Sequence, residues 1–196
     1  GSKLDNVGSG KISMTASGNI PGGETVIINP DGNVSIIGVT TESQSGGTKT
    51  LFENGLVNNV TASFDSYNNK VVVFYTAVSN SDYIRGCVGE VSGTSITFGT
   101  PVVITNPANY SKAIFDPSTN RHVLVYNENS SNVGFARVIE VSDNNSLVFG
   151  NQYAIESNRS LYETDICYDP NIEKVIVIGT GQFNHGVSYL GTVNPA

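Results

Sequence analysis

Apolar and polar residues follow the same order three times along the chain. The stretch FDSYNNKVVVFY at 64–75 returns as FDPSTNRHVLVY at 115–126 and as YDPNIEKVIVIG at 168–179. Each copy joins a polar turn to a nearly continuous apolar run, a pattern typical of a strand that is buried after a tight turn. The chain therefore contains a structural repeat of about 50 residues.

Each repeat is predicted to form four antiparallel strands. In the second unit these span 61–64, 70–76, 83–91 and 94–104. The run 71–75 is almost wholly apolar and should lie deep in the core, whereas the third strand alternates between apolar and polar residues. No window has a helical period. A recurring four-stranded unit of this length is typical of β-propeller blades.

We expect an all-β, β-propeller-like fold of about four units in one domain, 1–196. The alternatives are an open stack of repeated sheets and an intertwined β trimer. The first unit should contain the hairpin 27–37 and a strand at Thr50–Phe52. The last unit stops at Val193, where its fourth strand should begin, so we expect Lys11 to Ser17 to complete it. The predicted parts are an N-terminal segment (1–23), a partial first unit (24–60), two full units (61–111 and 112–163) and a partial last unit (164–196).

Charge and the length of the apolar runs argue against nucleic acids and membranes as partners. Charged residues make up 14% of the chain, and the formal net charge is −7 with a pI near 4.7. A nucleic-acid-binding protein would need Lys and Arg to neutralise phosphates, so we expect no nucleic-acid partner. No apolar run approaches the roughly 20 residues needed to span a bilayer, and no signal peptide is visible, so we expect no membrane partner.

The chain contains only two cysteines, Cys87 and Cys167. Two cysteines alone cannot complete a tetrahedral metal site, so two buried free thiols are predicted, with a disulfide or a metal pair as the alternative.

An aspartate recurs at the start of each predicted turn, as Asp65, Asp116 and Asp169. Aspartate at this position caps backbone N–H groups, so turn geometry alone accounts for it. The functional alternative is calcium, but none of the turns has the dense alternation of carboxylates that a compact calcium loop needs. We expect no metal and no cofactor.

The sequence offers no pattern for nucleophilic catalysis. Its histidines, His122 in a strand and His185 in a loop, lie in no GxSxG or comparable motif. A glycosidase needs two facing carboxylates; Glu90, Glu140 and Glu163 are available, but their spacing cannot establish a pair. We expect no catalytic residues and no enzymatic activity.

The loops divide into two sets according to the end of the sheets at which they lie. Turns after the first and third strands are short and alike, whereas loops after the second strand and crossings between units are longer and share no consensus. Loops freed from a repeat on a rigid scaffold commonly carry binding function. Their aromatic and hydrogen-bonding side chains suit a sugar ring or a protein epitope; the alternative is ordinary polar loops with aromatics that pack back. The candidate ligand-binding residues are Asn80, Asp82, Tyr83, Asn109, Tyr110, Asn132, Arg159, Tyr162, Phe183, Asn184 and His185.

Three strings carry a resemblance to a known group of proteins: ASFD at 62–65, NKVVV at 69–73 and VGEVSGTSITFGTPVV at 88–103. They resemble repeats of virion structural and tail-fibre proteins of tailed bacteriophages, especially marine ones. The third unit departs from this pattern, and the group supplies no agreed binding residues to carry over. The resemblance implies a location in the virion, contact with other virion proteins, display as a homo-oligomer and contact with a bacterial surface.

The expected function is a non-enzymatic tail-fibre or virion-appendage module that binds a host cell-surface glycan or protein through its long loops. The alternative is a purely structural decoration or spacer domain of the virion. A glycan-cleaving enzyme is the third hypothesis and would require paired carboxylates in a cleft.

Overall fold

The computed structural model describes residues 14–20, 22, 25–36, 46–156 and 160–194, and in these ranges the chain is all-β, as predicted. Its only helical elements there are two 3₁₀ turns, η1 (Val78–Asn80) and η2 (Gln182–Asn184). The chain divides into two compact units, Gly1–Ser45 and Gly46–Ala196.

The N-terminal unit contains the predicted hairpin. Strand β1 (Val26–Ile28) pairs with β2 (Val34–Ile36), and Asp31 shapes the turn by accepting a hydrogen bond from the Asn33 N–H at 2.9 Å. On the other side of β2, the Ser17 N–H donates to the Val34 carbonyl at 2.7 Å. This pairing lies within the N-terminal unit and differs from the predicted pairing of Lys11 to Ser17 with the last repeat; residues 11–13 are outside the described ranges.

The first sheet of the larger unit has the predicted hairpin order. It contains β3 (Val57–Asp65), β4 (Lys70–Ala77), β5 (Tyr83–Ser92) and β6 (Ser95–Phe98), and the start of β7 (Val102–Asp116) also pairs with β5. The predicted fourth strand, 94–104, is therefore two pieces on one edge. Pro101 has no N–H to give to a strand ladder, which accounts for the break.

The second sheet repeats this plan. The second half of β7 pairs with β8 (Arg121–Glu128), β8 pairs with β9 (Val133–Val141), and β9 carries both β10 (Leu147–Phe149) and β11 (Tyr153–Glu156) on its far edge. Strand β7 therefore ends one unit and begins the next.

The third sheet has three strands, β12 (Tyr162–Asp169), β13 (Lys174–Thr180) and β14 (Gly186–Gly191). The strands of the described ranges do not close into a ring.

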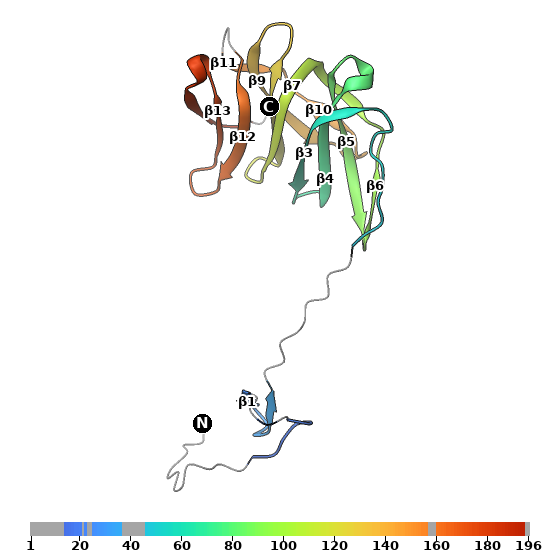
Figure 1. The fold of residues 1–196 in the computed structure, drawn as a ribbon, viewed down its shortest axis with the longest axis vertical. Helices are drawn as coiled ribbons and strands as arrows, with labels where there is room; N and C mark the ends of the chain where they lie inside the picture. The colour runs from blue at the N-terminus through green and yellow to red at the C-terminus, as the bar shows by residue number, and fades with distance from the viewer. Residues whose placement is uncertain (1–13, 21, 23–24, 37–45, 157–159, 195–196) are drawn as a thin grey trace. The chain divides into compact units, whose positions relative to one another are not determined.

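The first strands of the three sheets, β3, the second half of β7 and β12, lie next to one another (Figure 1). Two hydrogen bonds one repeat apart join them. The Ser111 hydroxyl donates to the Asn59 carbonyl at 2.9 Å, and the Thr164 hydroxyl donates to the Tyr110 carbonyl at 2.7 Å. The sequence repeat is thus also a repeat of inter-sheet bonding.

The cores lie between the faces of successive sheets. Val72 and Phe74 of the first sheet pack with Leu124 of the second, whereas Val123 and Val125, which point to the opposite face of β8, pack against the third sheet. The prediction that 71–75 lies deep in the core is confirmed for 72–75. Successive side chains of β8 point to opposite faces of the sheet, so this one strand stabilises two interfaces. Each buried aliphatic side chain of this size contributes roughly 1.5–3 kcal/mol.

The outer face of the first sheet is covered by residues 46–56, which we call the strap. Phe52 packs on Tyr75, with ring centroids 5.1 Å apart, and on Phe98, at 5.8 Å. The expectation of a strand at Thr50–Phe52 is wrong, because this segment crosses the sheet face as an irregular chain held by side chains. The strap covers the face of the first sheet that carries Val73 and Tyr75. The equivalent face of the second sheet packs against the first sheet, and that of the third sheet packs against the second.

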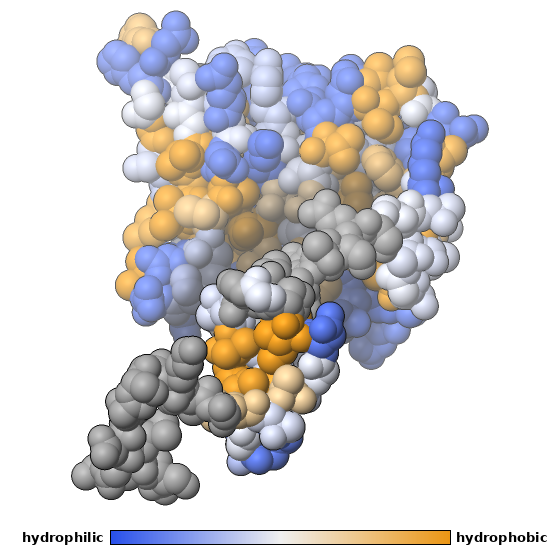
Figure 2. All heavy atoms as spheres, turned by 60° about the horizontal axis from the view of Figure 1, so that its bottom comes forward, coloured by the Kyte–Doolittle hydropathy of each residue, from blue (hydrophilic) through white to orange (hydrophobic). Residues whose placement is uncertain are grey.

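Among the residues that the structure describes in the larger unit, none covers Ile178 and Leu190 on the outer face of the last sheet. Ile178 and Leu190 are 50% and 64% exposed. In Figure 2 apolar side chains gather on the left of the larger unit, the side of β12–β14. Cys167 lies opposite Ile176 in this sheet and is exposed, which corrects the prediction of a buried thiol. Cys87 is buried as predicted, and desolvation raises the pKa of its thiol to about 11.

The repeated aspartates cap turns, as predicted. Asp65 accepts hydrogen bonds from the Tyr67 and Asn68 N–H groups, at 3.0 and 2.8 Å. Asp116 and Asp169 each accept one from the N–H two residues later, at 2.9 and 2.8 Å. The repeated segment, 64–75 and its two later copies, is therefore a capped turn followed by a core strand.

Candidate functional site

The longer loops and crossings gather at one end of the sheets, which we call the long-loop end: residues 78–82, 106–110, 129–132, 160–163 and 181–185. Backbone hydrogen bonds tie two of these loops to the crossing in β7. The Ala108 N–H donates to the Asp82 carbonyl at 3.0 Å, and the Asn129 N–H donates to the Pro107 carbonyl at 2.9 Å. The crossing is therefore clamped on both sides.

A β-bulge occurs at the same repeat position in all three sheets. Asn59, Tyr110 and Glu163 have left-handed backbones, with φ of 48°, 55° and 47°, and the strand register shifts at each of them. This conformation costs a non-glycine residue about 1 kcal/mol or more, and such strain is found preferentially at functional sites. The bulge redirects each first strand where it enters the sheet, and with it the neighbouring side chains.

Two tyrosines, Tyr110 at the second bulge and Tyr162 next to the third, form an exposed aromatic pair. The rings of Tyr110 and Tyr162 are 5.4 Å apart and perpendicular, and the residues are 42% and 41% exposed. Edge-to-face contact fixes the orientation of both rings while leaving apolar surface in water. This pair joins the second sheet to the third.

A row of hydrogen-bonded carboxamides passes through Asn109, the residue before Tyr110 in the chain. Asn59 Nδ2 donates to Asn109 Oδ1 at 3.2 Å, and Asn109 Nδ2 donates to Asn129 Oδ1 at 2.8 Å. Each amide in this row is held by its neighbour, so the remaining donors and acceptors have fixed directions. Directional amides beside flat aromatic faces are the groups with which proteins bind sugar rings and polar peptide surfaces.

The loop of the last sheet carries the most exposed aromatic of the predicted set. Phe183 is 76% exposed, and its ring centroid lies 6.2 Å from that of His185. Phe183 and Asn184 have left-handed backbones, with φ of 58° and 60°, and the Gly181 N–H closes the loop by donating to the His185 carbonyl at 2.9 Å. Because Tyr162 lies opposite Thr180 in the strand register, this loop follows directly from the strand that faces Tyr162.

The remaining predicted residues lie at the same end with different roles. Asn80 is exposed in η1, and the Asn132 carboxamide accepts a hydrogen bond from the Ser160 hydroxyl at 3.4 Å. Asp82 and Tyr83 are half-buried; Asp82 holds the crossing through its backbone, and Tyr83 pairs with Pro107. Arg159 lies outside the described residues. Of the predicted set, the side-chain contacts bring together Tyr110 with Tyr162 and Phe183 with His185.

Three residues that take part in this end were not in the predicted set: Asn59, Asn129 and Glu163. Glu163 Oε2 accepts a hydrogen bond from the Thr180 hydroxyl at 3.5 Å and lines a surface cavity of about 460 Å³ beside Ile178. The only sequence signal was their repeat position, since Asn59 and Glu163 align with Tyr110. Three different residue types occupy the bulge, so no consensus pointed to it.

Ser63, His122 and Asp65 form a set that resembles a nucleophile with its base. Ser63 Oγ lies 2.6 Å from His122 Nδ1, and His122 Nε2 lies 3.6 Å from Asp65 Oδ2. Ser63 is 8% exposed and His122 is 0% exposed, because they lie between the first and second sheets. Burial lowers the pKa of His122 to about 4, against the opposing effect of Asp65. A nucleophile buried in this way cannot reach a substrate, so the set acts in packing.

Two of the three glutamates considered for glycoside cleavage form ion pairs. Glu90 pairs with Lys70 at 3.2 Å, and Glu140 pairs with Arg121 at 3.0 Å, at the same repeat position. Both lie on the part of the third strand that leads to the short turns, whereas Glu163 lies at the long-loop end.

In the described ranges, no three His, Cys, Asp or Glu side chains are grouped so that they could hold a metal ion. None of the helices described there is long and apolar enough to cross a membrane.

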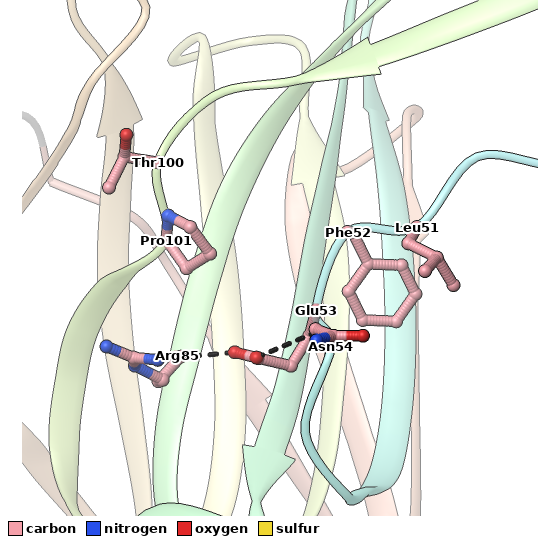
Figure 3. A pocket seen from close by; sticks show the side chains of 7 residues that line it. All are labelled: Leu51, Phe52, Glu53, Asn54, Arg85, Thr100 and Pro101. Atoms are coloured by element: carbon pink, nitrogen blue, oxygen red, sulfur yellow. Dashed lines mark hydrogen bonds and ion pairs between the residues drawn. The ribbon is translucent and has the colours of Figure 1, made fainter.

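A second pocket, of about 390 Å³, lies where the strap meets the first sheet (Figure 3). Its carboxylate, Glu53, is fully engaged: Oε2 accepts hydrogen bonds from the Tyr75 hydroxyl at 3.0 Å and from Arg85 Nη1 at 3.2 Å, and Oε1 accepts from the Asn54 and Gly55 N–H groups. The hydrogen bonds from Gly55 and Tyr75 lower the pKa of Glu53. The carboxylate therefore fastens the strap and has little capacity left for a ligand.

Profiles of known protein families, curated proteins and solved structures contain no match to this chain.

Proposed function

We propose that this chain is a non-enzymatic recognition module that binds a cell-surface glycan or protein through its long-loop end. The observation that carries the proposal is the pair Tyr110–Tyr162, whose exposed rings are held at right angles. The carboxamide of Asn109, the residue before Tyr110, is held in place by hydrogen bonds with Asn59 and Asn129. Exposed aromatics whose orientation is already fixed lose little entropy on binding, which favours recognition.

The setting of this module is a virion appendage such as a tail fibre, where it contacts other virion proteins and is displayed as a homo-oligomer. Support for this comes from the resemblance of the strings at 62–65, 69–73 and 88–103. The sheets are consecutive parts of a β-propeller-like arrangement of about four units; support for this comes from the adjacent first strands and from the inter-sheet hydrogen bond that recurs one repeat later.

The test is binding of the purified chain to a glycan array and to bacterial cells, with Tyr110→Ala, Tyr162→Ala and the double variant. Each single substitution should weaken binding about tenfold, because losing an aromatic contact costs about 1–2 kcal/mol. The matched control is Tyr67→Ala, which removes an aromatic that is 71% exposed in a short turn at the opposite end. Equal binding by the double variant and the wild type would refute the assignment of this surface. No binding to any glycan or cell by the wild type would favour the structural spacer.

A further inference from the structure

A groove of about 750 Å³ separates the second sheet from the third. Its floor is apolar and comes from both sheets, with Val123, Ala136 and Val138 on one side and Val175 and Val177 on the other. Asn151, Ser188 and Asn194 stand among the other residues that line it, and none of its lining residues is charged. An open apolar groove of this size, bordered by neutral polar groups, lacks the side chains that fill the rest of the core.

The same place between the first and second sheets is filled. Leu147, on β10, is buried in the core that joins these sheets, and Phe149 packs against the same core. Gly86 has no side chain there, and a Cβ added to it would lie 2.8 Å from Leu147 Cδ1. Ala136 is the counterpart of Gly86 one repeat later, since each lies opposite the equivalent residue of the preceding strand. The groove is thus the place that the next counterparts of Leu147 and Phe149 would occupy.

The strand beside the groove, β14, has one edge that pairs with no other strand of the described residues. Strand β5 pairs with β4 on one side and with β6 and β7 on the other, and β9 pairs with β8 on one side and with β10 and β11 on the other. In the described ranges β14 pairs with β13 alone. A free strand edge next to an apolar groove is the geometry with which proteins bind an added strand: the edge supplies main-chain hydrogen bonds, and the groove takes alternate side chains.

We infer that this groove is an acceptor site for an extended strand of a different partner polypeptide, which pairs antiparallel with β14 and carries large apolar side chains at two alternate positions. The repeat fixes this chemistry, because β10 presents Leu147 and Phe149 in that spacing at the equivalent edge of β9. At one place in the groove the Tyr189 hydroxyl donates to Glu156 of β11, so a hydrogen bond already joins the sheets there. The site is distinct from the long-loop end and does not depend on its function.

The probe is a synthetic peptide of residues 145–156, NSLVFGNQYAIE, added to the full chain labelled with ¹⁵N. Amide shifts should change in β14 and in the groove, and titration calorimetry should give a saturable isotherm. The matched control peptide carries serine in place of Leu147 and Phe149 and should bind at least tenfold more weakly.

A second arm uses the protein variant Ala136→Phe, which fills the groove, with Ala62→Phe on the exposed face of β3 as its control. Ala136→Phe should abolish peptide binding and Ala62→Phe should not change it. If Ala136→Phe does not fold, hydrogen exchange of the wild type decides: only the apolar peptide should slow exchange in β14. Absence of shifts at millimolar peptide, or equal binding of the serine peptide, would overturn the inference. Groove shifts that depend on protein concentration without peptide would give the site to a second copy of the chain and would also overturn it.

Discussion

The buried His122 makes stability depend on mild acid. Its ring lies between Phe74 and Phe115, with centroids 6.3 and 5.0 Å away, and its Nδ1 is 2.6 Å from the Ser63 hydroxyl. Desolvation disfavours the imidazolium, so the pKa falls from an ordinary 6.5 to about 4. Between these two pH values, His122 is protonated in the unfolded chain but not in the folded chain. The free energy of unfolding therefore falls as the pH falls.

The size of the effect follows from this difference in pKa. A pKa unit corresponds to about 1.4 kcal/mol, so a shift from 6.5 to about 4 removes about 3 kcal/mol of stability as the pH drops from about 7 to about 4. Below the folded pKa both states carry the proton, and this contribution no longer changes. Such a loss is a large fraction of the roughly 5–15 kcal/mol that stabilises a typical domain.

The assay is urea unfolding of the wild type and of His122→Val at several pH values from about 7 to about 4. Valine is the appropriate replacement, since Val71 and Val175 occupy the equivalent position in the other two sheets. The variant retains every carboxylate, so the difference between the two pH profiles isolates the histidine. His185→Gln, which changes an exposed histidine, should follow the wild type. Parallel profiles for wild type and His122→Val would refute the reasoning.

Two further substitutions test the packing between repeats. Gly86→Ala should lower the free energy of unfolding by about 1–3 kcal/mol, because its Cβ would lie 2.8 Å from Leu147 Cδ1. The control Gly150→Ala, with open space around the added carbon, should have little effect. In the double variant Gly86→Ala/Leu147→Ala, the loss of stability should be smaller than the sum of the two single losses. Thr164→Val removes the hydroxyl that donates a hydrogen bond to β7, and urea unfolding should show a free energy of unfolding lower by about 1 kcal/mol. The control Thr97→Val, at an exposed position, should leave this free energy unchanged. Equal effects of the two substitutions would contradict the role of the inter-sheet hydrogen bond.

Much of the fold could be predicted because local rules decide it. The aspartate of each repeat caps a turn through bonds that span two or three residues, so Asp65 and its counterparts could be assigned from their neighbours alone. The apolar run at 71–75 has one stable use, the core of a sheet buried on both faces. The exposure of Cys167 could not be predicted in the same way, because it depends on whether another sheet covers the last one.

The candidate site stays a prediction, and the sequence indicated some of its structural features but not others. The contrast between short, similar turns and long, dissimilar loops indicated that the long loops share one end of the sheets, where Tyr110 and Tyr162 are exposed. The bulge could not be predicted from the sequence, because strand pairing imposes the left-handed backbone at Asn59 and Glu163, and the bulge position shows no preferred residue type. The strap was missed for a similar reason: Phe52 and Glu53 are held by side chains distant in sequence.

The strap gives the row of sheets a direction. Residues 46–56 cover the face on which a preceding sheet would pack, and the Glu53 hydrogen bonds fasten them there, whereas the last sheet presents bare Ile178 and Leu190. The larger unit thus has one outer face that its own chain covers and one outer face with exposed apolar side chains. A further sheet that packs face to face, as the three sheets pack on one another, could therefore be added beyond the last sheet but not beyond the first unless the strap is dislodged, so units added in this way would extend the row in one direction only.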